Sequence, residues 1–221
     1  MPFCRADFFA VFVQYNAALW PVQVLACAAA LLCLYLLVRR SPITDRVILV
    51  VLAAMWAVNG IGYHGLFFSA INPAAYPFAA FFVAQAVCLT VFAVRGMEAD
   101  FAMRRDGRTA AGLLLIVFAI VLYPLWGMIA GHRYPAMPLL GTAPCPTTIF
   151  TIGLLLLGRW AVVRWLLPIP LLWSAIGGTA AFLLGVPQDL GLVAAGMTAV
   201  VFALGSMRDL PFARHGEEPE A

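Results

Sequence analysis

The sequence contains no lysine, and only 10% of its 221 residues are charged. Soluble domains are typically about 25% charged, so this scarcity of charge excludes an ordinary soluble enzyme and a disordered chain. The 13 arginines are scattered and leave a net charge of only +3. No basic face is present that could follow a phosphate backbone, which excludes a nucleic-acid-binding protein. Hydrophobic residues make up 64% of the chain, and the mean hydropathy of +0.98 predicts a multi-pass membrane protein.

Long apolar runs recur along the chain, each near the roughly 20 residues that a helix needs to cross a bilayer. We expect an all-α, polytopic transmembrane helix bundle with seven spans, at residues 19–38, 47–71, 75–94, 109–130, 147–163, 168–185 and 188–207. The fifth span is the least regular because Arg159 lies inside it. The fifth and sixth runs could instead form a tighter pair that enters only partway, which gives six spans plus a partial one.

The distribution of the arginines predicts how these spans are oriented in the membrane. Eleven of the 13 lie on one side, in the first and third loops, near the fifth run and in the C-terminal tail. The opposite side holds only Arg5 and Arg133. Because arginine accumulates in cytoplasmic loops, we expect the N-terminus outside and the C-terminus in the cytoplasm.

One domain accounts for the apolar runs, and a short segment flanks it at each end. Residues 18–208 form the transmembrane domain. Residues 1–17 are rich in phenylalanine and are expected to lie along the outer interface. The first apolar run is long enough to span, so the N-terminus does not resemble a cleavable signal peptide. Residues 209–221 contain three glutamates and are expected to form a cytoplasmic tail.

The few polar residues in the spans indicate the candidate site, because polar groups are costly in hydrocarbon. Most of them fall in the outer half of the bundle or at its outer surface. We expect a ligand-binding pocket there, lined by Asn59, Tyr63, His64, Gln85, Tyr134 and Asp189. The alternative is a close helix crossing, in which Gly60, Gly62 and Gly65 admit a neighbouring helix and the polar groups bond between helices.

The second outer segment, residues 131–148, contains four prolines and includes Pro144-Cys145-Pro146 near its end. Its apolar content predicts that it folds onto the bundle. A thiol at a helix N-terminus is favoured as a thiolate, so Cys145 is a candidate nucleophile with His132 or His64 as its base. The alternative is a structural plug in which Cys145 packs as a small hydrophobic residue.

Two further roles for Cys145 follow from its neighbours. Cys4 should share its compartment, so a disulfide between the two cysteines is conceivable. His64, His132 and Cys145, with Asp189 as a further ligand, are residue types that bind zinc or copper, but no local ligand spacing joins them. The sequence identifies no cofactor.

Three groups of residues resemble one known family. These are Tyr15-Asn16 with Trp20-Pro21, then Asn59-Gly60-Ile61-Gly62-Tyr63-His64 with Ile71-Asn72-Pro73, and the segment from Gly131-His132 to Thr147-Thr148. The chain resembles a bacterial membrane family catalogued only as a domain of unknown function, number 6064. The resemblance covers nearly the whole chain and implies a bacterial multi-pass protein of the plasma membrane, without implying an activity.

The leading functional hypothesis is a protein that binds or passes a small or lipid-like ligand through an outward-facing pocket. No carboxylate lies in the middle of a span, which argues against an energised pump. The second hypothesis is an intramembrane Cys/His enzyme acting on lipid, and the third is a non-catalytic subunit of a larger membrane complex. The lipid bilayer is the one partner common to all three.

Overall fold

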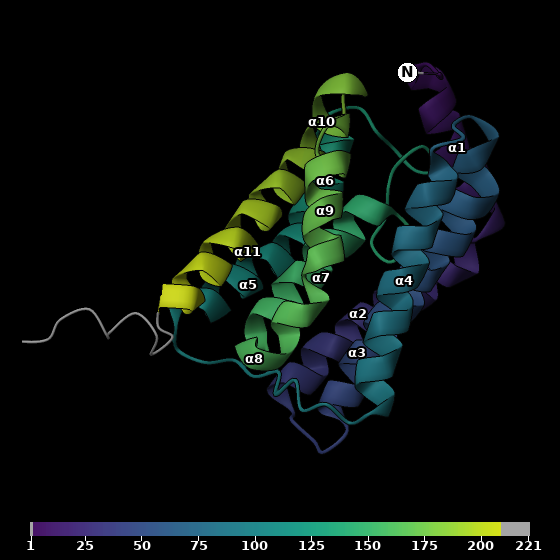
Figure 1. Ribbon diagram of the computed structural model, residues 1–221. Coiled ribbons are helices and arrows are strands. Elements are labelled where there is room, and N and C mark those ends of the chain that lie inside the picture. The colour runs from purple at the N-terminus through teal and green to yellow at the C-terminus, as the bar shows by residue number, and fades with distance from the viewer. Residues whose placement is uncertain (1, 209–221) are drawn as a thin grey trace, which may run out of the picture.

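The computed structural model describes residues 2–208, and every regular element within that range is helical (Figure 1). The α-helices are α1 (Arg5–Ala18), α2 (Trp20–Val38), α3 (Thr44–Ala57), α4 (Ala75–Val94), α5 (Gly107–Val117), α6 (Tyr123–Ile129), α7 (Pro144–Leu157), α8 (Trp160–Val163), α9 (Pro168–Gly177), α10 (Ala180–Leu183) and α11 (Leu190–Arg208). The predicted cytoplasmic tail, residues 209–221, lies outside the described residues.

Two π-helical segments sit inside long helices. The first, η1 (Val58–Phe67), continues α3 and leads into the short 3₁₀ turn η2 (Phe68–Ala70). The second, η3 (Phe118–Leu122), joins α5 to α6 just before Pro124, whose ring nitrogen has no hydrogen to donate. Such widened turns are rare and occur frequently at functional sites.

Five helices are long and apolar enough to cross a membrane: Trp20–Val38, Thr44–Ala70, Ala75–Val94, Gly107–Ile129 and Pro187–Ser206. A sixth crossing is obtained if the pair Trp160–Leu166 and Pro168–Leu183, bent by 47°, counts as one span. The outward faces suit lipid, since Val94 is 75% exposed and Ile129 is 86% exposed.

The expected count of seven full spans is not confirmed. The fifth run was expected to continue to Val163, but α7 ends at Leu157 after 14 residues, or about 21 Å. Gly158 and Arg159 leave the helical conformation before α8 begins. The described helices long enough to cross therefore number five, or six with the bent pair counted as one, and α7 is too short to be among them.

Helix α7 is the centre of the fold. All of its residues except Cys145 are buried, and α5, α9 and α11 pack around it. Gly112 of α5 and Gly153 of α7 allow a close crossing, because a Cβ at Gly112 would lie 2.6 Å from the Gly153 carbonyl oxygen. The buried Thr151 hydroxyl accepts a hydrogen bond from Trp56 Nε1 at 2.9 Å and donates to the Thr147 carbonyl.

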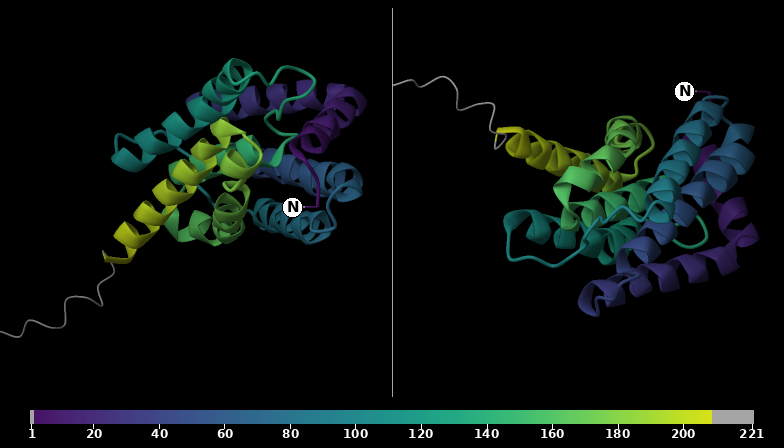
Figure 2. Two further views of the ribbon diagram at one scale, coloured as in Figure 1. Left: turned by 90° about the horizontal axis from the view of Figure 1, so that it is seen from above. Right: turned by 60° about the horizontal axis from the view of Figure 1, so that its bottom comes forward.

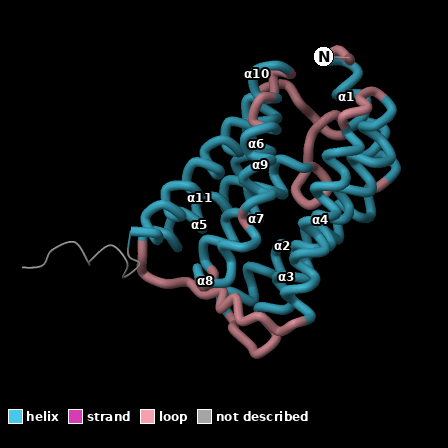
Figure 3. The backbone as a smooth tube through the Cα atoms, in the orientation of Figure 1, coloured by secondary structure: helices cyan, strands magenta, loops and turns pink. Residues whose placement is uncertain are grey.

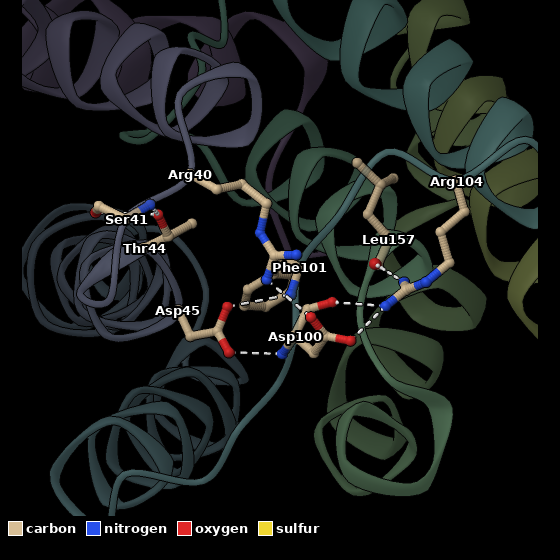
Figure 4. A network of polar contacts seen from close by, with 8 residues as sticks. All are labelled: Arg40, Ser41, Thr44, Asp45, Asp100, Phe101, Arg104 and Leu157. Atoms are coloured by element: carbon tan, nitrogen blue, oxygen red, sulfur yellow. Dashed lines mark hydrogen bonds and ion pairs between the residues drawn. The ribbon is translucent and has the colours of Figure 1, made fainter.

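The loops that carry most of the arginines are joined at one end of the bundle (Figure 4). Arg40 and Arg104 both form ion pairs with Asp100, at 2.8 and 2.6 Å. The Asp45 carboxylate accepts hydrogen bonds from the backbone N–H groups of Asp100 and Phe101. The hydrogen bond from Arg40 is the main cause that holds the pKa of Asp100 below its usual value. We call this end the arginine end.

The opposite end carries α1 and the proline-rich segment, and we call it the N-terminal end. Helices α1 and α2 meet at an angle at Leu19 (Figure 2). The segment between α6 and α7 runs inward as a long loop (Figure 3), as its apolar content predicts. Its residues Met137 and Ala143 are buried, and Asn16 Nδ2 donates to the carbonyl oxygens of Pro135 and Met137 at 2.6 and 2.8 Å.

The expectation for residues 1–17 was a segment lying along the outer interface. Within it, α1 buries one face, formed by Phe8, Val11, Phe12, Tyr15 and Asn16, against the bundle. Its buried rings contact η1 and form a second hydrophobic cluster beside the main core. The N-terminal segment is thus part of the packed bundle.

Candidate functional site

A cavity of about 280 Å³ lies at the N-terminal end of the bundle. Helices α1 and α4, the π-helical segment η1 and the start of α6 contribute to its wall. The proline-rich segment, the start of α7 and the region from α9 through α10 to Asp189 complete it. Segments far apart in the sequence therefore meet at one place. The lining is overwhelmingly apolar, with a small polar region.

The apolar part of the wall is aromatic. Phe12 stacks on Tyr63 with a 5.1 Å centroid separation, and Tyr63 stacks on Phe68 at 5.5 Å. Phe8 meets Phe68 edge-on at 6.1 Å. We call Phe8, Phe12, Tyr63, Phe68 and Trp173 the aromatic wall; all five line the cavity. Aromatic rings of this kind bury a large apolar area and present electron-rich faces to a bound group.

The polar region is formed by Tyr123, Cys145 and Asp189, all of which line the cavity. The Tyr123 hydroxyl donates to Asp189 Oδ1 at 2.6 Å. The Cys145 thiol lies beside the Asp189 carboxyl, and Cys145 stays partly exposed because it faces the cavity. Asp189 is only 2% exposed and lies in the turn η5 (Pro187–Asp189), immediately before α11. We call these three residues the polar cluster.

His64 lines the same cavity and has no hydrogen-bond partner on either ring nitrogen among the described residues. Its imidazole is fully buried between rings, with centroid separations of 4.8 Å to Phe82 and 5.1 Å to Trp173. Trp173 Nε1, which lies beside the Cys145 thiol, is likewise buried and makes no hydrogen bond within residues 2–208. Two polar side chains at this cavity are therefore left without protein partners, which is costly unless another molecule supplies them.

Tyr63, His64 and Asp189, three of the six residues predicted to bind a ligand, come together at the cavity with Cys145. The other three lie elsewhere. Asn59 Nδ2 donates to the carbonyl oxygens of Met55 and Gly141, and Gln85 Nε2 donates to that of Leu166. Tyr134 is 54% exposed, with its hydroxyl 3.5 Å from the Asn16 carbonyl oxygen.

His132 does not line the cavity. Its ring lies 4.4 Å from that of Phe9, and its nitrogens lie 3.3 Å from Arg5 Nη2 and 3.4 Å from Gln188 Nε2. Burial, and then the Arg5 guanidinium, lower the pKa of His132 below its ordinary value. No hydrogen bond joins His132 to Cys145 in the described part of the chain, so the predicted nucleophile–base pair is not assembled here.

The metal and disulfide hypotheses gain no support from the geometry. Within residues 2–208, no group of three or more His, Cys, Asp or Glu side chains gathers closely enough to hold a metal ion. His64, His132 and Cys145 therefore do not form the metal site that their residue types suggested. Cys4 and Cys145 are both free thiols, so no disulfide joins these two cysteines.

The model of one protein family, described as a family of unknown function (DUF6064), matches residues 5–214. The chain belongs to this family. The match confirms the resemblance found in the sequence and includes the polar cluster, His64 and the aromatic wall. No curated protein and no solved structure matches the chain.

The predicted ligand-binding set of this DUF6064 chain did not include two residues that line the cavity, Tyr123 and Trp173. Tyr123 and Trp173 both lie beside helix breaks, Tyr123 before Pro124 and Trp173 before Gly177. Breaks of this kind line cavities in membrane proteins. An aromatic residue with a polar atom next to a break was the signal that could have found them.

Proposed function

We propose that the chain is a membrane-embedded binding protein for a small, mainly apolar molecule that carries a polar group. The observation that carries this proposal is the aromatic cavity with buried polar side chains that the protein itself leaves unpaired. Ligand pockets generally combine an apolar lining with a few convergent polar groups. At about 280 Å³, the cavity suits a compact ligand.

The polar side chains give the ligand a reason to bind. A buried imidazole without a partner costs about 1–3 kcal/mol, and His64 is in that state. A ligand that donates a hydrogen bond to His64, or accepts one from it, would remove this cost. Its apolar part would fill the cavity and pack against the aromatic wall. Binding therefore uses both the burial of apolar surface and the pairing of orphaned polar groups.

We propose further that the cavity faces the outside of a bacterial plasma membrane. The arginine-rich loops are joined by the Asp100 ion pairs at the opposite end of the bundle. Since arginine is retained in the cytoplasm, that end would be cytoplasmic and the N-terminal end extracytoplasmic.

A second cavity supports passage of the ligand as well as binding. It has a volume of about 180 Å³ and shares Tyr123 and Pro138 with the main cavity. Cys27 and Leu31, which are exposed on α2, line its other side. Movement of the Tyr123–Pro138 partition would connect the binding cavity to the lipid-facing surface.

The enzyme hypothesis has weaker support. The group beside the Cys145 thiol is the carboxyl of Asp189, whereas a thiol nucleophile is usually activated by an imidazole or a cationic neighbour. The geometry thus favours a binding role for the polar cluster.

The proposal is tested by filling the cavity. Ala180 lines it, whereas Ala175 of α9 is exposed and lines a groove on the outer side of the bundle. We expect 3,3-dimethylbutan-1-ol, a neutral alcohol with a bulky apolar body, to raise the thermal unfolding temperature of the purified protein saturably in detergent. The variant Ala180→Phe should lose this response and Ala175→Phe should keep it. An unchanged response in Ala180→Phe would show that the alcohol binds elsewhere.

A further inference from the structure

We propose that the natural ligand is an organic cation, with an ammonium group on a compact apolar body, held by Asp189 and the aromatic wall. This inference rests on the proposed binding function and specifies its ligand class. It follows from the charge balance of the cavity and from the chemistry of its lining.

Asp189 carries a buried carboxyl group with no cationic side chain paired to it among the described residues. It is 2% exposed, and it makes no ion pair among residues 2–208. A buried carboxylate is tolerated only when it is paired or strongly hydrogen-bonded. The Tyr123 hydroxyl supplies one hydrogen bond, which leaves the charge itself in place.

The local backbone offsets part of the cost of ionising this carboxyl group. Helix α11 begins at Leu190, so its positive end lies next to Asp189. A helix end supplies about half of an elementary charge, so the dipole only partly balances the carboxylate. A cation in the cavity would supply the rest of the balance and stabilise the carboxylate at the polar cluster.

Among the side chains that the structure describes, none is placed to complete the balance. The sequence has no lysine, and Arg5 is the arginine held against this region. Arg5 is solvent-exposed, does not line the cavity, and directs its guanidinium to the Gly185 carbonyl and to His132. A positive charge that pairs with this carboxylate would therefore come from a bound molecule, and the cavity is the space that can hold it.

The aromatic wall provides the second half of a cation site. The faces of Trp, Tyr and Phe attract cations, and rings gathered around a cavity are a common way to recognise ammonium groups. The stacked row of Phe12, Tyr63 and Phe68 lines the same cavity as Trp173 and Asp189. A carboxylate beside several rings favours a cation over a neutral molecule of equal shape.

His64 adds a directional contact. A neutral imidazole has one nitrogen that accepts a hydrogen bond, and the acceptor of His64 is unused in the described structure. It can accept from an N–H of a protonated amine or from a hydroxyl on the body of a quaternary ammonium ion. The site therefore has a group for each part of such a ligand: the charge, the apolar body and one donor.

The test compares two probes of nearly the same shape that differ in charge. Choline carries a trimethylammonium group, and 3,3-dimethylbutan-1-ol carries a neutral tert-butyl group in its place. We expect the wild-type protein in detergent to bind choline about tenfold or more tightly than the alcohol, measured as saturable quenching of tryptophan fluorescence. In Asp189→Asn, which keeps an acceptor for Tyr123, the two affinities should become equal. Phe68→Leu should reduce the preference while leaving the charge in place.

The outcomes separate this inference from the proposed function. Equal binding of both probes by the wild-type protein, abolished in Ala180→Phe, would overturn the cation inference and leave the binding function standing. Binding of neither probe would contradict both. The comparison of probes on the wild-type protein does not depend on any variant folding, and the unfolding temperature of Asp189→Asn without probe shows whether that variant is folded.

Discussion

Buried polar side chains in this protein fall into two kinds at the residue scale. Asn59 and Gln85 serve the fold, since the amide nitrogen of each donates to a backbone carbonyl of another segment, while Asn59 Oδ1 has no partner among the described residues. His64 serves no such contact, and both of its nitrogens are unpaired in the described structure. The sequence identified all three residues as costly, but sequence spacing does not show which carbonyl groups tertiary packing brings near. The partners of Asn59 and Gln85 lie about 80 residues away in the chain, which is why only part of the site was predictable.

The contrast leads to a stability prediction. Replacing His64 with Phe removes an unpaired imidazole from a cage of rings, so we expect the free energy of unfolding to be unchanged or higher. Ligand binding should weaken in the same variant. Thermal unfolding in detergent and probe titration measure the two effects.

Asn59→Leu is the matched comparison. It leaves the Gly141 carbonyl without its donor, which should cost about 1–3 kcal/mol. A loss of stability in His64→Phe as large as in Asn59→Leu would mean that the imidazole supports the fold.

At the element scale, hydropathy located the lipid-facing helices closely. The predicted spans 19–38 and 75–94 agree with α2 and α4 to within one residue. The same signal failed at α7, because a helix buried in protein and a helix buried in lipid are equally apolar. Gly158 itself gives no hydropathy signal, and the neighbouring Arg159 is the residue in the sequence that marked this run as irregular.

The crossing of α5 and α7 gives the prediction at this scale. A methyl group at Gly112 would collide with the Gly153 carbonyl oxygen and with Leu157, so Gly112→Ala should force the helices apart. We expect a loss of about 1–3 kcal/mol, measured as a lower unfolding temperature in detergent.

Gly107→Ala, on the same helix, is the control. A Cβ there meets no atom within 4 Å, so its unfolding temperature should stay the same or rise slightly. Equal behaviour of the two variants would contradict the close crossing.

The whole molecule separates its charge between its two ends. The arginine end holds the Asp100 ion pairs, and the N-terminal end holds the cavity. Alternation of arginine along the sequence predicted which loops would be neighbours, and the contacts among Arg40, Asp100 and Arg104 agree with it. The direction of insertion in a cell is a separate prediction, because the fold is the same for either direction.

Cysteine labelling tests that direction. Cys4 is exposed at the N-terminal end, so a membrane-impermeant maleimide should label it in intact bacterial cells, with the signal lost in Cys4→Ser. A cysteine introduced by Ser41→Cys, at the arginine end, should react only after the cells are permeabilised. Labelling of the Ser41→Cys site in intact cells, without labelling of Cys4, would reverse the orientation.

The burial of α7 has a consequence for biogenesis. Its 14 residues are fewer than the roughly 20 that a helix needs to span a bilayer, so acyl chains alone hold it weakly while the ribosome is still adding later residues. Helices α9 and α11 form much of its surroundings and are synthesised after it. Correct packing of α7 therefore depends on α9 and α11, which are synthesised after it.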